Sequence, residues 1–213
     1  QATGHLWEYP AQPASDSSSM NYAVGGARVG RKGDDLISTL LIPGLLDQLE
    51  ELDYAHIEKD TLIVSWFGGN DLFALSKLLA SGANPAPLVK EVNDNLEQEL
   101  ETLYSANGRI FLLPNVPDAS LTPEFKNNGD TARALTKVIN DTIASVAANF
   151  EAKHTGEVTI YKPDMLKLMG VVTRYPSAFG FSNTTDKCID DETCRLNPTP
   201  LETGYLFWGG VHA

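Results

Sequence analysis

The sequence has no long apolar run and few basic residues, and each shortage excludes a class of function. No apolar stretch reaches the roughly 18 residues that a membrane-spanning helix requires. Lysines and arginines number 16 against 28 aspartates and glutamates, which gives a formal net charge of -12. Because such a charge repels phosphates and anionic headgroups, no nucleic-acid partner is predicted. The short apolar runs predict no transmembrane segment. Gln1 to Gly4 also lack the charged and apolar regions of an export signal, so we expect any signal to have been removed or not included.

Cysteine is equally scarce, because Cys188 and Cys194 are the only two. Their close spacing in a polar stretch predicts a local disulfide, worth about 2 kcal/mol in the loop-entropy relation. A disulfide indicates a secreted, extracellular protein, whereas two reduced surface thiols are the alternative. No cluster of histidines or further cysteines lies nearby, so no metal site is predicted.

Helical and strand patterns alternate along the 213 residues, which is typical of one α/β domain, 1–213, with a mostly parallel central sheet. Strands are expected at 22–24, 61–67, 110–113, 157–161 and 205–207. Helices are expected at 36–52 with a break at Pro43, and at 87–104, 135–150 and 163–169. The stretch 173–204 shows no periodicity and is predicted to be a long loop that holds both cysteines.

Small and polar residues follow three of the expected strands. A backbone N–H at Gly26 and the side-chain amide of Asn70 could stabilise an oxyanion, and His212 could act as a general base. Because the carboxyl ends of parallel strands meet at one edge of a sheet, these groups are expected to converge. Phe67 and Gly69 would then border the substrate pocket. The pattern predicts an acyl-transfer site.

Each feature also has an explanation without function. Gly68-Gly69-Asn70-Asp71 is an ordinary turn sequence, and Gly25-Gly26 could serve tight packing. A histidine near a chain end is usually just solvated. The order and spacing of the pieces favour the functional interpretation.

Four blocks of the chain resemble successive blocks of the GDSL, or SGNH, hydrolase family. They are Asn21-Tyr22-Ala23-Val24-Gly25-Gly26-Ala27, Trp66-Phe67-Gly68-Gly69-Asn70-Asp71, Leu112-Leu113-Pro114-Asn115-Val116-Pro117-Asp118 and Tyr205-Leu206-Phe207-Trp208-Gly209-Gly210-Val211-His212. The likeness is strongest to the bacterial phospholipase/lecithinase/hemolysin-type branch and extends to acetylesterases. It implies a flavodoxin-like three-layer α/β/α sandwich, no cofactor, and ester hydrolysis through an acyl-serine. Gly26 and Asn70 would be the oxyanion donors and His212 the base.

The chain departs from this family pattern in its nucleophile. The family carries that serine in a Gly-Asp-Ser-Leu block upstream of the segment that matches Gly4 to Tyr9, so the nucleophile is expected to lie outside residues 1–213. Ser15, Ser17, Ser18 and Ser19 lack the strand-end context of a nucleophile. We therefore expect the chain to lack a first strand with the nucleophile, as well as a last helix. A separately cleaved N-terminal segment is one partner that could supply the serine.

The second departure is Gly209, which stands where the family usually has an aspartate that orients the histidine. An imidazolium that forms in a site of low dielectric constant needs a negative partner. Glu202 or the Asp190-Asp191 pair could supply a carboxylate. Alternatively, backbone N–H groups of Gly209 and Gly210 could hold an anion such as chloride. We favour the anion, because a Gly-Gly turn can present such donors.

Three hypotheses follow from the sequence. The first is a serine ester hydrolase acting on a lipid, a phospholipid or, as a variant, an acetylated carbohydrate. The second is a catalytically silent family member that binds acyl or glycan ligands. The third is an unrelated flavodoxin-like binding domain, which the absence of a Gly-x-Gly-x-x-Gly phosphate loop disfavours.

Overall fold

The computed structural model describes residues 21–30, 42–196 and 204–212. Its main sheet has three parallel strands in the order β1-β2-β3, and a separate two-stranded parallel sheet pairs β4 with β5. The strands are β1 Leu62–Val64, β2 Ile110–Leu112, β3 Thr159–Tyr161, β4 Asn183–Lys187 and β5 Tyr205–Phe207. The α-helices are α2 Leu45–Glu51, α3 Gly69–Ala80, α4 Ala86–Ser105, α5 Gly129–Lys153, α6 Met165–Arg174 and α7 Glu192–Leu196. Short 3-10 helices are η1 Tyr54–His56, η2 Ala119–Leu121, η3 Pro123–Phe125, η4 Pro176–Phe179 and η5 Cys188–Asp190.

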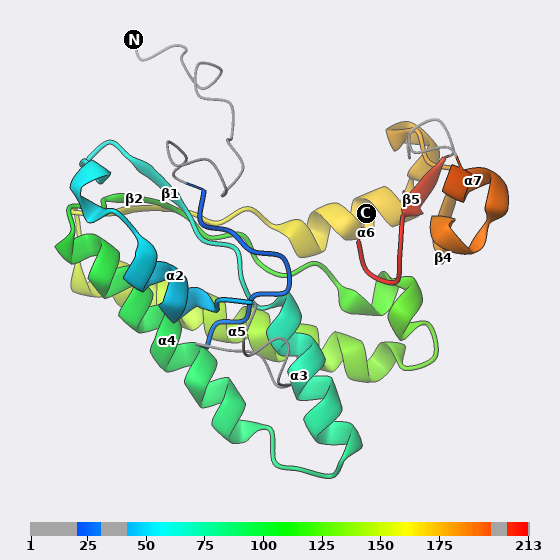
Figure 1. Ribbon diagram of the computed structural model, residues 1–213, viewed down its shortest axis with the longest axis horizontal. Coiled ribbons are helices and arrows are strands. Elements are labelled where there is room, and N and C mark those ends of the chain that lie inside the picture. The colour runs from blue at the N-terminus through cyan, green and yellow to red at the C-terminus, as the bar shows by residue number, and fades with distance from the viewer. Residues whose placement is uncertain (1–20, 31–41, 197–203, 213) are drawn as a thin grey trace.

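The hydrophobic core lies between the main sheet and the helices α2 to α5, which gather on one side of it (Figure 1). The two longest helices form it because their apolar residues recur at helical spacing. In α4 these are Leu88, Val92, Leu96, Leu100 and Leu103, all buried. The predicted helices at 87–104 and 135–150 and the central strands are confirmed, and the chain has the mixed α/β class with a parallel sheet.

The other side of the main sheet is exposed to solvent. Outward-pointing side chains of β1 and its extension, Leu62, Val64 and Trp66, are 43%, 60% and 52% exposed, and Tyr161 of β3 is 56% exposed. The continuous apolar run of β1 is the sequence of a strand that is covered on both faces. One of those faces has no cover within the described residues.

Two of the predicted elements are wrong. Residues 22–24 form no strand, because no neighbouring strand pairs with them among the described residues. The stretch 173–204 is not a long loop, since its described part contains η4, β4, η5 and α7. Lacking apolar periodicity, this part is ordered by short-range contacts that include a disulfide between Cys188 and Cys194, whose Cα atoms are 5.3 Å apart. Part of the expected helix at 36–52, residues 36–41, lies outside the described residues, and α2 begins after Pro43 as expected.

A small cavity of about 20 Å³ lies between β1 and α4 and has room for one water molecule. Two polar residues, Ser65 and Glu99, line it among apolar side chains. Glu99 is 4% exposed, and its Oε2 has no hydrogen-bond partner in the described structure. Burial raises the pKa of Glu99 to about 7, although a hydrogen bond from Ser65 acts in the opposite direction.

Glu99 should make folding stability depend on pH. Its folded pKa of about 7 exceeds the ordinary value of 4.5, so the folded chain holds this proton more tightly than the unfolded chain. Stability is therefore retained below pH 4.5 and lost as the pH rises towards 7, by about 3 kcal/mol in total. Glu99→Gln should remove this loss and exceed the parent in stability at pH 8.

Urea denaturation at a series of pH values measures the effect. Glu97→Gln, on the exposed face of the same helix, is the matched control and should follow the parent. If Glu99→Gln and the parent show the same slope of unfolding free energy against pH, the buried carboxyl is not the cause.

Candidate active site

A tight turn at Gly68 places Asn70 and Asp71 at the start of α3. Gly68 has φ of +105°, and a Cβ there would lie 2.7 Å from Cγ2 of Ile139, so only glycine fits. Its carbonyl accepts the Leu72 N–H at 3.0 Å, which begins the helix. The sequence Gly-Gly-Asn-Asp thus forms a helix N-terminus and not an isolated turn. Helix α3 itself was not among the predicted elements.

The side chain of Asn70 lies against the segment that contains Gly26. Its Nδ2 donates to the carbonyl oxygen of Ala27 at 2.9 Å, and Gly26 precedes Ala27 with φ of +87°. Nδ2 carries two hydrogens, so one is used by Ala27 and the other has no partner in the described structure. The structure therefore brings together two of the three predicted site residues.

Asp71 holds the same segment through Val29 and Arg28. Its fully buried carboxylate accepts the Val29 N–H, which is 3.2 Å from each oxygen, and its Oδ1 lies 3.5 Å from Nε of Arg28. Burial raises the pKa of Asp71, while the Val29 N–H and the Arg28 guanidinium oppose that rise. Sequence analysis missed this role, although an acidic residue next to Asn70 was visible in the motif.

His212 lies on a different part of the molecule, in the turn after β5. The Trp208 N–H donates to the His212 carbonyl at 2.9 Å, and the Ile189 N–H donates to the Trp208 carbonyl at 3.0 Å. The His212 side chain is exposed. Within the described structure no hydrogen bond joins it to Asn70 or Gly26. Because β5 pairs with β4, this turn does not follow a strand of the main sheet, contrary to expectation.

The two glycines of this turn have different surroundings. A Cβ at Gly209 would meet nothing within 4 Å, so the space where the family pattern has an aspartate is open. A Cβ at Gly210 would lie 2.7 Å from Oε2 of Glu124. In the described part of the chain, the N–H groups of both glycines have no hydrogen-bond acceptor.

One of the carboxylates that could substitute for the missing aspartate has other partners. Asp191 accepts the Cys194 N–H at 2.8 Å and the Tyr205 hydroxyl at 3.3 Å. Glu202 lies outside the described residues.

The two predicted pocket residues, Phe67 and Gly69, lie in different environments. Phe67 is half-buried, packs against the core and lines the small cavity with Ser65 and Glu99. Gly69 is exposed at the start of α3, with open space around its Cα. Gly69 thus remains next to Asn70 at the surface, whereas Phe67 supports the site from inside.

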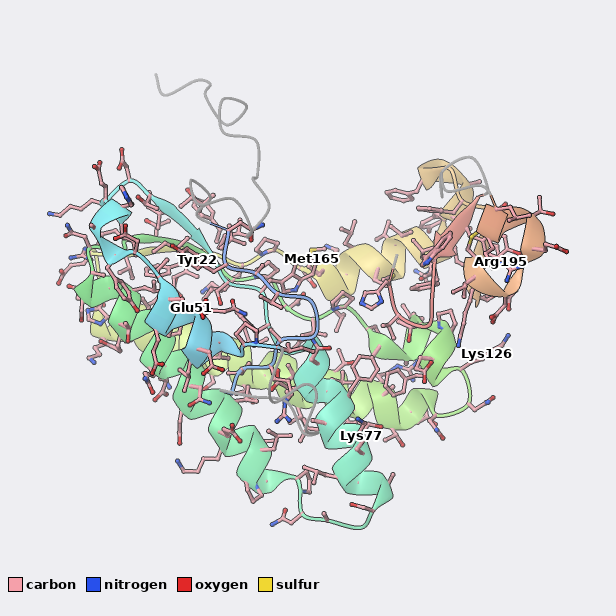
Figure 2. The ribbon with its side chains drawn as sticks, in the orientation of Figure 1. Tyr22, Glu51, Lys77, Lys126, Met165 and Arg195 are labelled. Atoms are coloured by element: carbon pink, nitrogen blue, oxygen red, sulfur yellow. A yellow bond between two sulfur atoms is a disulfide. The ribbon has the colours of Figure 1, made fainter. Side chains whose placement is uncertain are left out.

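A broad, open pocket of about 1010 Å³ lies between α6, the η2–η3 segment and β4. Its lining combines apolar residues, among them Leu121, Leu166, Val171 and Tyr175, with the cations Lys126, Lys167 and Arg174, the carboxylates Asp118 and Asp164, and several hydroxyl side chains. Figure 2 labels Met165, where α6 begins, and Lys126, which lies below the β4–β5 sheet. Lys126 is 3.4 Å from Asp186, but no carboxylate of the described structure lies within 4.0 Å of Lys167 or Arg174.

The described residues contain no group of three or more histidines, cysteines, aspartates or glutamates that could hold a metal ion. No helix among them is both long and apolar enough to cross a bilayer.

Comparison with known proteins shows the family to which this α/β chain with a parallel sheet belongs. The profile described as GDSL-like lipase/acylhydrolase matches residues 8–213, so the chain belongs to that family. It is also similar to the thermolabile hemolysin of Vibrio parahaemolyticus serotype O3:K6, strain RIMD 2210633. The two are 28% identical over 194 residues, which cover 89% of this chain and 43% of the relative. The chain thus spans less than half the length of that relative.

Loss of the Asp71 carboxylate should destabilise the fold at the candidate site. Asp71→Ala leaves the Val29 N–H without its acceptor and Arg28 without this counter-charge, so we expect a loss of about 3 kcal/mol in unfolding free energy. Chemical denaturation measures the change. Asp141→Ala, which removes an exposed carboxylate paired with Lys137 on α5, should cost less than about 0.5 kcal/mol. Equal effects of the two substitutions would contradict the anchoring role of Asp71.

Proposed function

We propose that this chain belongs to a serine ester hydrolase that acts on lipid or other carboxylic esters through an acyl-serine. The Gly26 N–H and the free hydrogen of Asn70 Nδ2 would stabilise the oxyanion, and His212 would act as general base and acid. The observation that carries the proposal is the hydrogen bond from Asn70 to Ala27, because it sets the amide beside Gly26 with one donor unused. Membership of the GDSL-like family supports the same chemistry.

The nucleophilic serine in this scheme comes from a segment outside residues 1–213. Ser65 is 6% exposed and hydrogen-bonds to Glu99, so it cannot serve. The outer face of the main sheet has no cover among the described residues, so a segment outside them has room to lie there. Such a segment could belong to the same polypeptide or be a separately cleaved chain. The greater length of the Vibrio relative agrees with either source.

The broad pocket beside α6 is the proposed site for the substrate's apolar part. Thr122 and Lys126, which flank η3, line this pocket, and η3 bonds to the turn of His212 through the Glu124 N–H and the Gly210 carbonyl at 3.0 Å. The apolar lining residues suit an acyl chain, and Lys126, Lys167 and Arg174 suit a negatively charged group of the ester. The disulfide between Cys188 and Cys194 supports an extracellular location.

Asn70 provides the first test of the proposed site. In protein that carries the nucleophile segment, Asn70→Ala should lower kcat by roughly 10² to 10³ on a short-chain p-nitrophenyl ester, because one oxyanion donor is lost. Asn127→Ala, at an exposed position before α5, should leave turnover unchanged. Circular dichroism and thermal unfolding check that both variants fold. Full turnover in folded Asn70→Ala would remove Asn70 from the site.

The open space at Gly209 leads to a second test. We propose that a monovalent anion such as chloride occupies it, held by the free N–H groups of Gly209 and Gly210, and balances the imidazolium of His212. Activity should then depend on the halide present, and Gly209→Asp should abolish that dependence while activity survives. Gly209→Asn introduces a side chain of similar size without a charge, so its activity should still depend on the halide.

Ester hydrolysis rates in chloride and in a bulky-anion buffer provide the measurement. If the parent keeps full activity after exhaustive exchange into the bulky anion, no anion is required. The missing charge would then have to come from a carboxylate.

A further inference from the structure

Glu124 in η3 contacts the histidine turn in two ways, although it lies far from it in the sequence. Its backbone N–H donates to the Gly210 carbonyl oxygen at 3.0 Å. Its Oε2 lies 2.7 Å from the position that a Cβ of Gly210 would occupy, so the carboxylate covers the open side of that glycine. Both contacts reach the residue that stands two positions before His212.

Lys187 of β4 lies beside the Glu124 side chain. The Lys187 Nζ lies 3.6 Å from Glu124 Oε2, and the two side chains are 34% and 53% exposed. Lys187 also pairs in register with Phe207, the last residue of β5. One lysine therefore links the strand that leads into the turn with the carboxylate that packs on it.

The turn needs such a restraint. Two adjacent glycines allow the backbone many conformations, and apart from the bond between Trp208 and His212 the turn has few internal hydrogen bonds in the described structure. A general base must stay within hydrogen-bond reach of the proton that it accepts. A displacement of about 1 Å can cost up to about 10² in rate.

We propose that Glu124 is a positioning residue for His212. Its N–H fixes the carbonyl of Gly210, and its carboxylate blocks the space into which the glycine turn would otherwise relax. Glu124 does not touch the reacting atoms. This inference rests on the proposed function, since it gives His212 its role as base.

The kinetic test compares two substitutions of the same residue, in protein that carries the nucleophile segment. Glu124→Ala removes the covering group and should lower kcat about tenfold, with KM for a soluble ester unchanged within about twofold. Glu124→Gln retains the packing and loses only an exposed ion pair, which is worth little, so it should stay within about twofold of the parent. Glu97→Ala, at an exposed position on α4, is the control and should match the parent. A kcat of Glu124→Ala equal to that of the parent would overturn the proposal.

Gly210→Ala tests whether the two residues act together. The new methyl group would displace the Glu124 carboxylate, so the single variant should resemble Glu124→Ala. Because Gly210→Ala and Glu124→Ala remove the same contact, the double variant should be no slower than Glu124→Ala alone. Independent, multiplicative losses would contradict a shared contact.

Amide hydrogen exchange tests the restraint without any catalytic activity. In the chain itself, Glu124→Ala should speed exchange in the peptide that covers 205–212 about tenfold, while the peptides of α4 and α5 remain unchanged. If Glu124→Ala speeds this exchange but the parent that carries the nucleophile segment hydrolyses no ester, the restraint stands and the proposed function is refuted. Unchanged exchange would refute the restraint whether or not the parent is active.

Discussion

The candidate site depends on two side chains in the first turn of α3 that hold the segment 27–29. Asn70 donates to Ala27, and the buried Asp71 accepts from Val29 and lies beside Arg28. That segment forms no strand of the main sheet, so these bonds hold it in place, together with the Leu45 N–H that donates to the Arg28 carbonyl at 2.9 Å. A helix N-terminus tolerates the acidic Asp71 there, because the helix dipole favours negative charge at that end. The position of Asn70 beside the Gly26 segment is thus a consequence of how α3 begins.

Two buried carboxyl groups illustrate opposite solutions to the cost of burial. Asp71 is surrounded by a backbone donor and a guanidinium, which oppose the rise in its pKa. Glu99 has only Ser65, and burial raises its pKa to about 7. The difference follows from location, since Asp71 faces a loop with free N–H groups, whereas Glu99 faces β1 across an apolar interior. Loops can supply donors that a strand has already used in its sheet.

Sequence patterns predicted the elements whose stability comes from apolar periodicity. Helix α4 and the strands of the main sheet appear where Val92, Leu100 and Phe111 indicated them. Residues 22–24 have a strand-like composition, but a strand also needs a hydrogen-bonding neighbour, which composition does not reveal. The region after α6 is ordered by the disulfide and by short pairings with no periodic signal. For the site, the motif indicated Asn70, while the long-range partners Ala27 and Glu124 could only be found in the structure.

The location of His212 follows from the same limits of local pattern. Its strand, β5, pairs with β4 and not with the main sheet, so Asn70 and His212 lie in two parts of the molecule, and α6 runs between them (Figure 1). Asn70 is fixed by a helix that packs into the core, whereas His212 follows two glycines at the surface. The relative position of the two residues is therefore set by contacts between these parts. Among these contacts the Gly210 carbonyl accepts a hydrogen bond from η3, which itself precedes the core helix α5. This bond couples the position of the proposed base to the core that holds the proposed oxyanion donor.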